Sequence, residues 1–140
     1  KIKNTFVSAT NNLTSVITVK ALKSVSGTFN LSVILIQDSI KGPQKYPTYS
    51  EPNYVFNHVM RGALSSNGNP NPWGEQLWSG SVSVNDSIVT TYSNFSINPL
   101  FISHPLFVPK HCHIIAYVYD NDNASATYYI KQAEIAEMTE

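Results

Sequence analysis

The sequence predicts an all-β fold, an immunoglobulin-like antiparallel β-sandwich of about seven strands that forms a single domain over residues 1–140. The length of 140 residues is that of one domain with one core. Ser, Thr and Asn account for 41 residues and hydrophobic residues for 42%, a mixture that favours strands over helices. Several short segments alternate apolar with polar residues between turn signals, as half-buried strands do.

The first three predicted strands lie in the N-terminal part of the chain. A short strand over residues 6–9 precedes one over residues 13–25, where apolar residues recur at every second position. A third strand follows a turn at residues 26–27, and one of its faces is made by Phe29, Leu31, Val33 and Leu35. Because Ile34 and Ile36 add apolar residues to its other face, we expect the second half of this strand to be covered on both faces.

Residues 41–52 hold one glycine and three prolines, and this composition predicts a long exposed connection between strands. The segment carries Tyr46 and Tyr49, and binding residues concentrate on loops of this kind. Residues 54–64 fit either a helix or a strand, because their apolar residues recur at both spacings, and the strand is slightly favoured.

Four more strands are predicted in the C-terminal half, over residues 79–84, 87–95, 114–119 and 127–135. Turn signals separate them, at Asn85-Asp86, Asn98-Pro99, His104-Pro105 and the run Asp120 to Asn123.

Charge and motif content exclude several classes of function. Nine basic residues balance nine acidic ones, so the chain offers no cationic surface for a nucleic acid and we expect no nucleic-acid partner. No apolar run is long enough to cross a bilayer. The sequence contains no G-x-S-x-G, H-E-x-x-H or phosphate-binding glycine motif, so we expect no catalytic residues and no enzyme activity.

His111-Cys112-His113 is the strongest candidate for a metal site or a nucleophile. On a strand the two histidines point one way and Cys112 points the other, so the three side chains cannot meet on one ion. His58 or His104 would have to complete a site with the histidines. We expect instead a structural thiol in the core.

A second metal candidate is the run Asp120 to Asn123, which is similar to the start of a calcium loop. The loop glycine is replaced by Ser125 and the distal glutamate is missing, so the run predicts a turn. We therefore expect no metal and no cofactor in this chain.

Arg61 is the only arginine in the chain. A lone guanidinium near Asn57 and His58 suits a bidentate clamp for a ligand carboxylate. An internal bond to Asp38 or Glu51 is the favoured interpretation. The clamp interpretation makes Arg61, Asn57 and His58 candidate binding residues.

Aromatic residues supply the remaining binding candidates. Trp73 and Trp78, together with Tyr46 and Tyr49, suit an aromatic surface for a sugar or a peptide. Burial in the core explains a Trp equally well. Tyr54 is a further candidate in the segment that follows the predicted connection.

Five blocks of the sequence occur in a recognisable order: LSVILIQDSIKGPQ, NYVFNHVMRGAL, NPWGEQL, HIIAYVYDNDN and IKQAEI. They resemble, over about residues 13–135, the C-terminal part of the outer membrane protein 28-related family of Bacteroidetes-type cell envelopes. The most specific residues of the resemblance are Asp38, Gln44, Asn57, His58 and Arg61. Where family members show an acidic pair before the loop, this chain has Gln37-Asp38.

The resemblance implies an exported cell-envelope protein, outer membrane-associated or periplasmic, that touches the membrane only through an N-terminal lipid anchor outside this chain. Longer family members look like a thioredoxin-like domain with a CxxC motif followed by this β-rich module. This chain has no CxxC, so it corresponds to the C-terminal module of such a protein.

Three hypotheses of function follow. The first is an adhesin- or receptor-like binding module that presents the loops at residues 41–52 and 67–74 to a peptide or a glycan. The second is an accessory domain of an envelope thiol-disulfide protein, whose partner is an upstream thioredoxin-like domain. The third and least favoured is a hydrolase, which would need a pocket that joins His58, Arg61 and a perturbed carboxylate.

Overall fold

The structure is a computed structural model that describes residues 1–65, 73–97, 107–121 and 128–139. These residues form one 3-10 turn, η1 (Pro109–His111), and ten strands: β1 (Ile2–Val7), β2 (Asn12–Lys20), β3 (Val25–Gln37), β4 (Ile40–Lys45), β5 (Ser50–Phe56), β6 (Val59–Ala63), β7 (Glu75–Val82), β8 (Ser87–Ser96), β9 (Cys112–Asp120) and β10 (Ile130–Glu137). The predicted all-β antiparallel class is confirmed. In these ranges no helix is long and apolar enough to cross a membrane.

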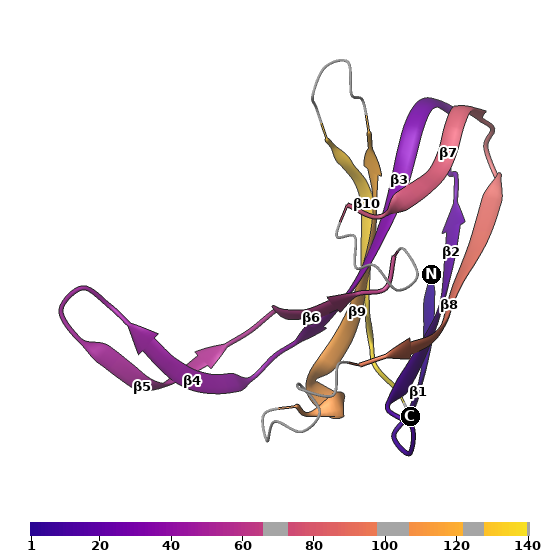
Figure 1. Cartoon of the computed structure of the whole chain (residues 1–140). Helices are drawn as coiled ribbons and strands as arrows, with labels where there is room; N and C mark the ends of the chain where they lie inside the picture. The colour runs from indigo at the N-terminus through magenta and orange to yellow at the C-terminus, as the bar shows by residue number, and fades with distance from the viewer. Residues whose placement is uncertain (66–72, 98–106, 122–127, 140) are drawn as a thin grey trace.

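The strands form three antiparallel sheets (Figure 1). The order of the first is β1-β2-β8, and that of the second is β10-β9-β3-β6, with β7 also paired to β3. The long strand β3 is central. On one edge its residues 29–37 pair with β9. On the other edge its residues 25–31 pair with β7 and its residues 34–37 pair with β6. β4 and β5 make the third sheet and pair only with each other within the described part of the chain.

The first two sheets pack face to face over the hydrophobic core. Alternate residues of β3 and β9 point inward, and they meet Leu13 and Ile17 from β2 and Tyr92 from β8. The backbone N–H of Phe6 in β1 donates to the carbonyl of Thr139 (2.8 Å), which joins the two sheets at one edge. The second half of β3 is buried on nearly every residue, as the two apolar faces predicted.

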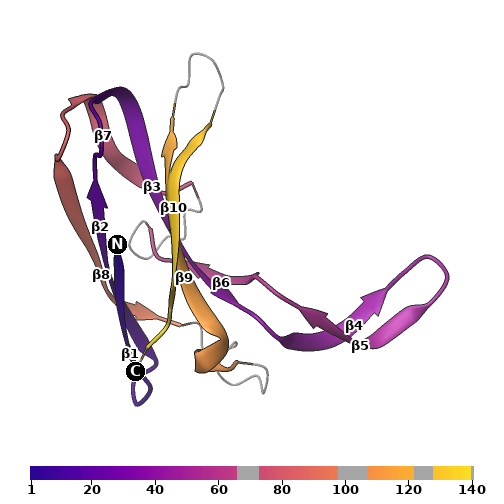
Figure 2. The ribbon, with the colours of Figure 1, turned by 180° about the vertical axis from the view of Figure 1, so that it is seen from behind.

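The β4–β5 hairpin projects away from the two packed sheets in both views (Figures 1 and 2). We call residues 40–56 the arm and the two packed sheets the body. Among the described residues, the main core cluster contains none from the arm. The arm is therefore held by its own strand pairing and by its attachment to β3 and β6.

Two sequence-based expectations were wrong in this region. The predicted connection at residues 41–52 is mostly strand, and only residues 46–49 turn between β4 and β5. Pro43 falls at a register shift between Gly42 and Gln44, and a bulge on an unpaired edge is where a strand tolerates proline. The two arm strands and β6, none of which is among the seven predicted strands, raise the total from about seven to ten.

The predicted turn at residues 26–27 was also wrong. These residues belong to β3, and the second predicted strand ends at Lys20 instead of residue 25. Gly27 pairs with Gly80 of β7, and both have positive φ angles of 148° and 90°. The glycine thus marks an irregular strand pair and not a chain reversal.

Other expectations about strands were confirmed. Most of residues 54–64 is strand, at the end of β5 and in β6, as the favoured interpretation predicted, but the strand is interrupted at Asn57-His58. Asn85-Asp86 forms a turn, in which Asp86 Oδ2 accepts from the backbone N–H of Ser83 (2.7 Å). The turn signals at Asn98-Pro99 and His104-Pro105 lie outside the described residues, as do the second half of the calcium-like run and residue 127 of the last predicted strand.

Candidate binding site

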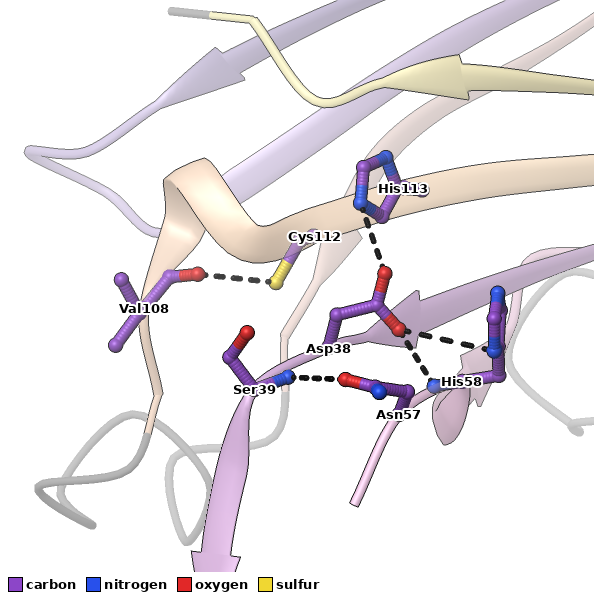
Figure 3. A network of polar contacts seen from close by, with 7 residues as sticks. All are labelled: Asp38, Ser39, Asn57, His58, Val108, Cys112 and His113. Carbon is purple, nitrogen blue, oxygen red and sulfur yellow. Dashed lines mark hydrogen bonds and ion pairs between the residues drawn. The ribbon is translucent and has the colours of Figure 1, made fainter. Parts of the chain in front are cut away.

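The arm joins the body through two short links, Asp38-Ser39 after β3 and Asn57-His58 before β6 (Figure 3). Ser39 and His58 have φ angles of 59° and 56°, a left-handed conformation that costs energy for residues with a side chain. Two bonds across the links compensate. Asp38 Oδ1 accepts from the His58 backbone N–H (2.6 Å), and Asn57 Oδ1 accepts from the Ser39 backbone N–H (3.0 Å).

The Asp38 carboxylate also lies between two imidazoles (Figure 3). Its Oδ2 is 3.3 Å from His113 Nε2, and its Oδ1 is 3.9 Å from His58 Nδ1. The Asp38 backbone N–H donates to the carbonyl of His111 (2.9 Å). One residue thereby ties β3 to the start of β9 and to the link before β6. We call Asp38, Ser39, Asn57, His58 and His113 the arm base.

Arg61 lies on β6, beside the arm base. Its Nε donates to Gln37 Oε1 (3.1 Å), and Gln37 is completely buried at the end of β3. The sequence analysis favoured an internal bond for Arg61 but named Asp38 and Glu51 as its partners, and the bond shown here goes to Gln37. A buried amide oxygen gains a charged donor in this way, which is a structural role.

Cys112 lies beneath the arm base and points into the core, as the alternation of the His111-Cys112-His113 triplet predicted. Its side chain is 1% exposed, and its Sγ lies 3.5 Å from the carbonyl oxygen of Val108. Burial raises the pKa of the thiol from 9.0 to about 11, while Arg61 lowers it and Asp38 raises it further. A thiol in this state is a poor nucleophile.

The arm carries four aromatic side chains. Tyr46 and Tyr49 stack at its tip, with ring centroids 4.6 Å apart and planes 15° from parallel. Tyr54 and Phe56 make an edge-to-face pair (4.8 Å), and Phe56 lies over Gly42 on the opposite strand. Tyr49 and Tyr54 are exposed. The arm therefore presents aromatic surface to its surroundings.

The structure brings together some of the predicted site residues and separates others. Asp38, Asn57 and His58 meet at the arm base, and Arg61 lies next to them. Gln44 lies farther out, on β4. Trp73 lies two residues before β7, a strand of the body that lies away from the arm (Figure 1), so it does not form one aromatic surface with the tyrosines at the arm tip.

Ser39, Gln37 and His113 contribute to this site although no sequence signal assigned them to it. The pairing of β3 with β9 sets His113 opposite Ile36 and so brings it to Asp38. The pairing of β3 with β6 brings Gln37 to Arg61. Strand alternation did separate His113 from Cys112. It gave no signal for the carboxylate that His113 faces.

The described residues contain no group of three His, Cys, Asp or Glu side chains placed to hold a metal ion. Asp38 accepts a backbone hydrogen bond, and its two histidine neighbours lie on different elements. The arrangement suits a structural joint that holds the arm. The part of this region that is open for contact with a ligand is the aromatic surface of the arm, where Tyr49 and Tyr54 are exposed.

Fold and site together define a class of protein, a two-sheet all-β domain with a projecting two-stranded arm. No family model matches the sequence, and no curated protein matches it either. Among solved structures, the chain is similar to the crystal structure of a domain of the outer membrane lipoprotein Omp28 from Porphyromonas gingivalis. The TM-score is 0.59 at 21% identity, over 99% of this chain and 86% of that chain. The resemblance stated from the sequence is confirmed at the level of the fold.

Proposed function

We propose that this chain is a non-catalytic module of an exported, outer membrane-associated envelope protein, and that its arm binds a peptide or glycan partner. The fold it shares with a domain of an outer membrane lipoprotein supports the envelope location. The family resemblance of the sequence points the same way. A lipid anchor outside this chain would connect the module to the membrane.

The observation that carries the binding role is the exposed, aromatic arm outside the core. Tyr49 is 59% exposed and Tyr54 39%, and the body gains no core contacts from either. Tyr side chains give a large contact area at low entropic cost, so exposed tyrosines on a projecting element suit recognition.

Of the two candidate partners, a peptide is favoured over a glycan. In the described structure β4 and β5 pair only with each other, so each has an outer edge without a strand beside it. An extended peptide can add to such an edge through backbone hydrogen bonds, with side chains selecting the sequence. The two prolines in the arm strands, Pro43 and Pro52, limit where this pairing can occur.

The experiment is a selection of ligands from a random linear peptide library and from a glycan array, with the whole chain as bait. Selected ligands are then measured against a Tyr46→Ser/Tyr49→Ser double variant. Val89→Ser is the matched control, because Val89 is 61% exposed on β8 of the body. We expect the arm variant to lose about tenfold or more in affinity and the control to bind like the wild type. Equal binding by all three proteins would contradict the role of the arm.

A further inference from the structure

A second group of aromatic side chains lies on the body, on the outer face of the sheet that contains β9. Tyr117 and Tyr119 alternate with the inward-pointing Ala116 and Val118, so both face away from the core. Their ring centroids are 6.1 Å apart, and Tyr128, just before β10, makes an edge-to-face contact with Tyr119 at 6.3 Å. Together with Trp73 we call these three tyrosines the aromatic platform.

Hydrogen bonds fix the platform in place. The hydroxyl of Tyr119 donates to the backbone carbonyl of Trp73 and accepts from the side-chain amide of Asn30 (3.1 Å). Gly74, with a φ angle of 74°, lies so close to β3 that an added Cβ would be 2.1 Å from the Leu31 carbonyl oxygen. The backbone at Trp73 and Gly74 is therefore held against β9 and β3, which fixes the point from which the Trp73 ring projects.

The residues of the platform differ in exposure: one is buried and supports the others, of which two are open to solvent. Tyr119 is 6% exposed and forms the buried support. Trp73 is 70% exposed and Tyr128 53%, and Ile130, which pairs with Tyr119, is 62% exposed. Large aromatic residues that are left open to solvent beside a buried aromatic support are typical of interaction surfaces.

The polar groups around the platform are neutral or neutralise each other. Lys131 Nζ is 3.2 Å from Asp120 Oδ2 at its border, so that pair adds no net charge. The Oδ1 atom of Asn30 is a buried acceptor without a hydrogen-bond partner among the described residues. Among the described residues, the surface thus offers exposed ring faces and phenol groups, and the Lys131–Asp120 pair leaves no excess charge there.

We propose that the aromatic platform is a binding site for a neutral carbohydrate. The C–H face of a pyranose ring is apolar and stacks on the face of a Trp or Tyr ring, while its hydroxyls bond to phenol groups. Among its described residues the platform has both features and no net charge, so it suits a neutral sugar better than a charged ligand or a flat apolar partner. The site does not depend on the proposed function, since the arm and the β10 end of the sheet project to different sides (Figure 2).

The test measures binding of the whole chain to an array of neutral oligosaccharides, followed by titration calorimetry on the strongest of them. Trp73→Ala and Tyr128→Ala are the test variants. Tyr129→Ala is the matched control, because Tyr129 is next in sequence and 65% exposed, but the ring that contacts Tyr119 is that of Tyr128. Tyr49→Ala is the control for the arm.

We expect both test variants to bind the sugar about tenfold more weakly or worse, and both controls to bind within about twofold of the wild type. Unchanged thermal unfolding of the variants shows that the loss is local. If no neutral oligosaccharide on the array binds, or if binding survives both substitutions, the proposal is wrong. If Tyr49→Ala alone abolishes sugar binding, the platform is not the site and the arm is.

Discussion

Asp38 accepts a hydrogen bond from the backbone N–H of His58 at 2.6 Å, and this bond crosses from the strand that enters the arm to the strand that leaves it. Both links have a residue in the left-handed conformation, Ser39 in one and His58 in the other. The direction of the arm is therefore set by side chains at its base and not by packing against the body.

The first prediction concerns this carboxylate. We expect Asp38→Ala to lower the free energy of unfolding by about 1–3 kcal/mol, because it removes a charged acceptor from the His58 N–H and separates His113 from its partner. Urea unfolding measures the change. The control is Glu51→Ala, which removes a carboxylate bond to the N–H of Asn53 within one strand of the arm and should cost less than about 0.5 kcal/mol.

Amide hydrogen exchange adds a local readout for the same variant. The His58 amide should exchange faster in Asp38→Ala, because its acceptor is gone. An Asp38→Ala protein as stable as the wild type, with the His58 amide equally protected, would show that the carboxylate does not hold the arm.

The second prediction compares two glycines. Gly74→Ala should lower the free energy of unfolding by more than about 3 kcal/mol, because its Cβ would meet the backbone of Leu31 and Ser32. Gly80 also has a positive φ angle, 90°, but no atom lies within 4 Å of an added Cβ. Gly80→Ala should therefore cost only the backbone strain, about 1–2 kcal/mol. Thermal unfolding of the two variants compares their losses of stability. If Gly74→Ala and Gly80→Ala lower the free energy of unfolding equally, Gly74 does not lie against β3.

The third prediction concerns pH. Burial raises the pKa of Cys112 from 9.0 to about 11, so the unfolded chain loses this proton at a lower pH than the folded one. The stability that the neutral thiol contributes is fully present below about pH 9 and is lost as pH rises toward about 11, by about 2 kcal/mol.

Urea unfolding of the wild type and of Cys112→Ala across this pH range isolates the effect. Tyr92, whose pKa is also raised by burial, contributes to both proteins and cancels in the comparison. The wild type should lose more stability than the variant as pH rises. Parallel pH profiles would mean that the thiol is not buried in the folded protein.

The sequence allowed the body to be predicted better than the arm or its base. Alternation along residues 29–36 predicted a strand covered on both faces, and the same rule placed Cys112 in the core. The arm strands were missed because proline and glycine signal loops, whereas here Pro43 lies at a bulge in an unpaired edge. Such a bulge depends on the partner strand, which a local pattern does not identify.

The contacts of the site were harder still to predict, since they join residues far apart in the chain. Asp38, Asn57 and His58 were candidates because of Arg61 and of the family resemblance, but no spacing rule predicted their bonds. His113 reaches Asp38 only through the pairing of β3 with β9. Trp73 was grouped with the arm tyrosines, but its contact is with the hydroxyl of Tyr119.

The central claim is that the body folds by itself and holds out an arm whose surface is not needed for folding. The most direct measurement is the free energy of unfolding of a chain in which an Asn-Gly turn replaces residues 42–54. This change keeps the Ile40–Phe56 pair, which lies next to the arm base. Because a lone two-stranded hairpin contributes little stability, the account predicts a change of less than about 1 kcal/mol. A loss of about 3 kcal/mol or more would contradict it, since the arm would then belong to the folded body.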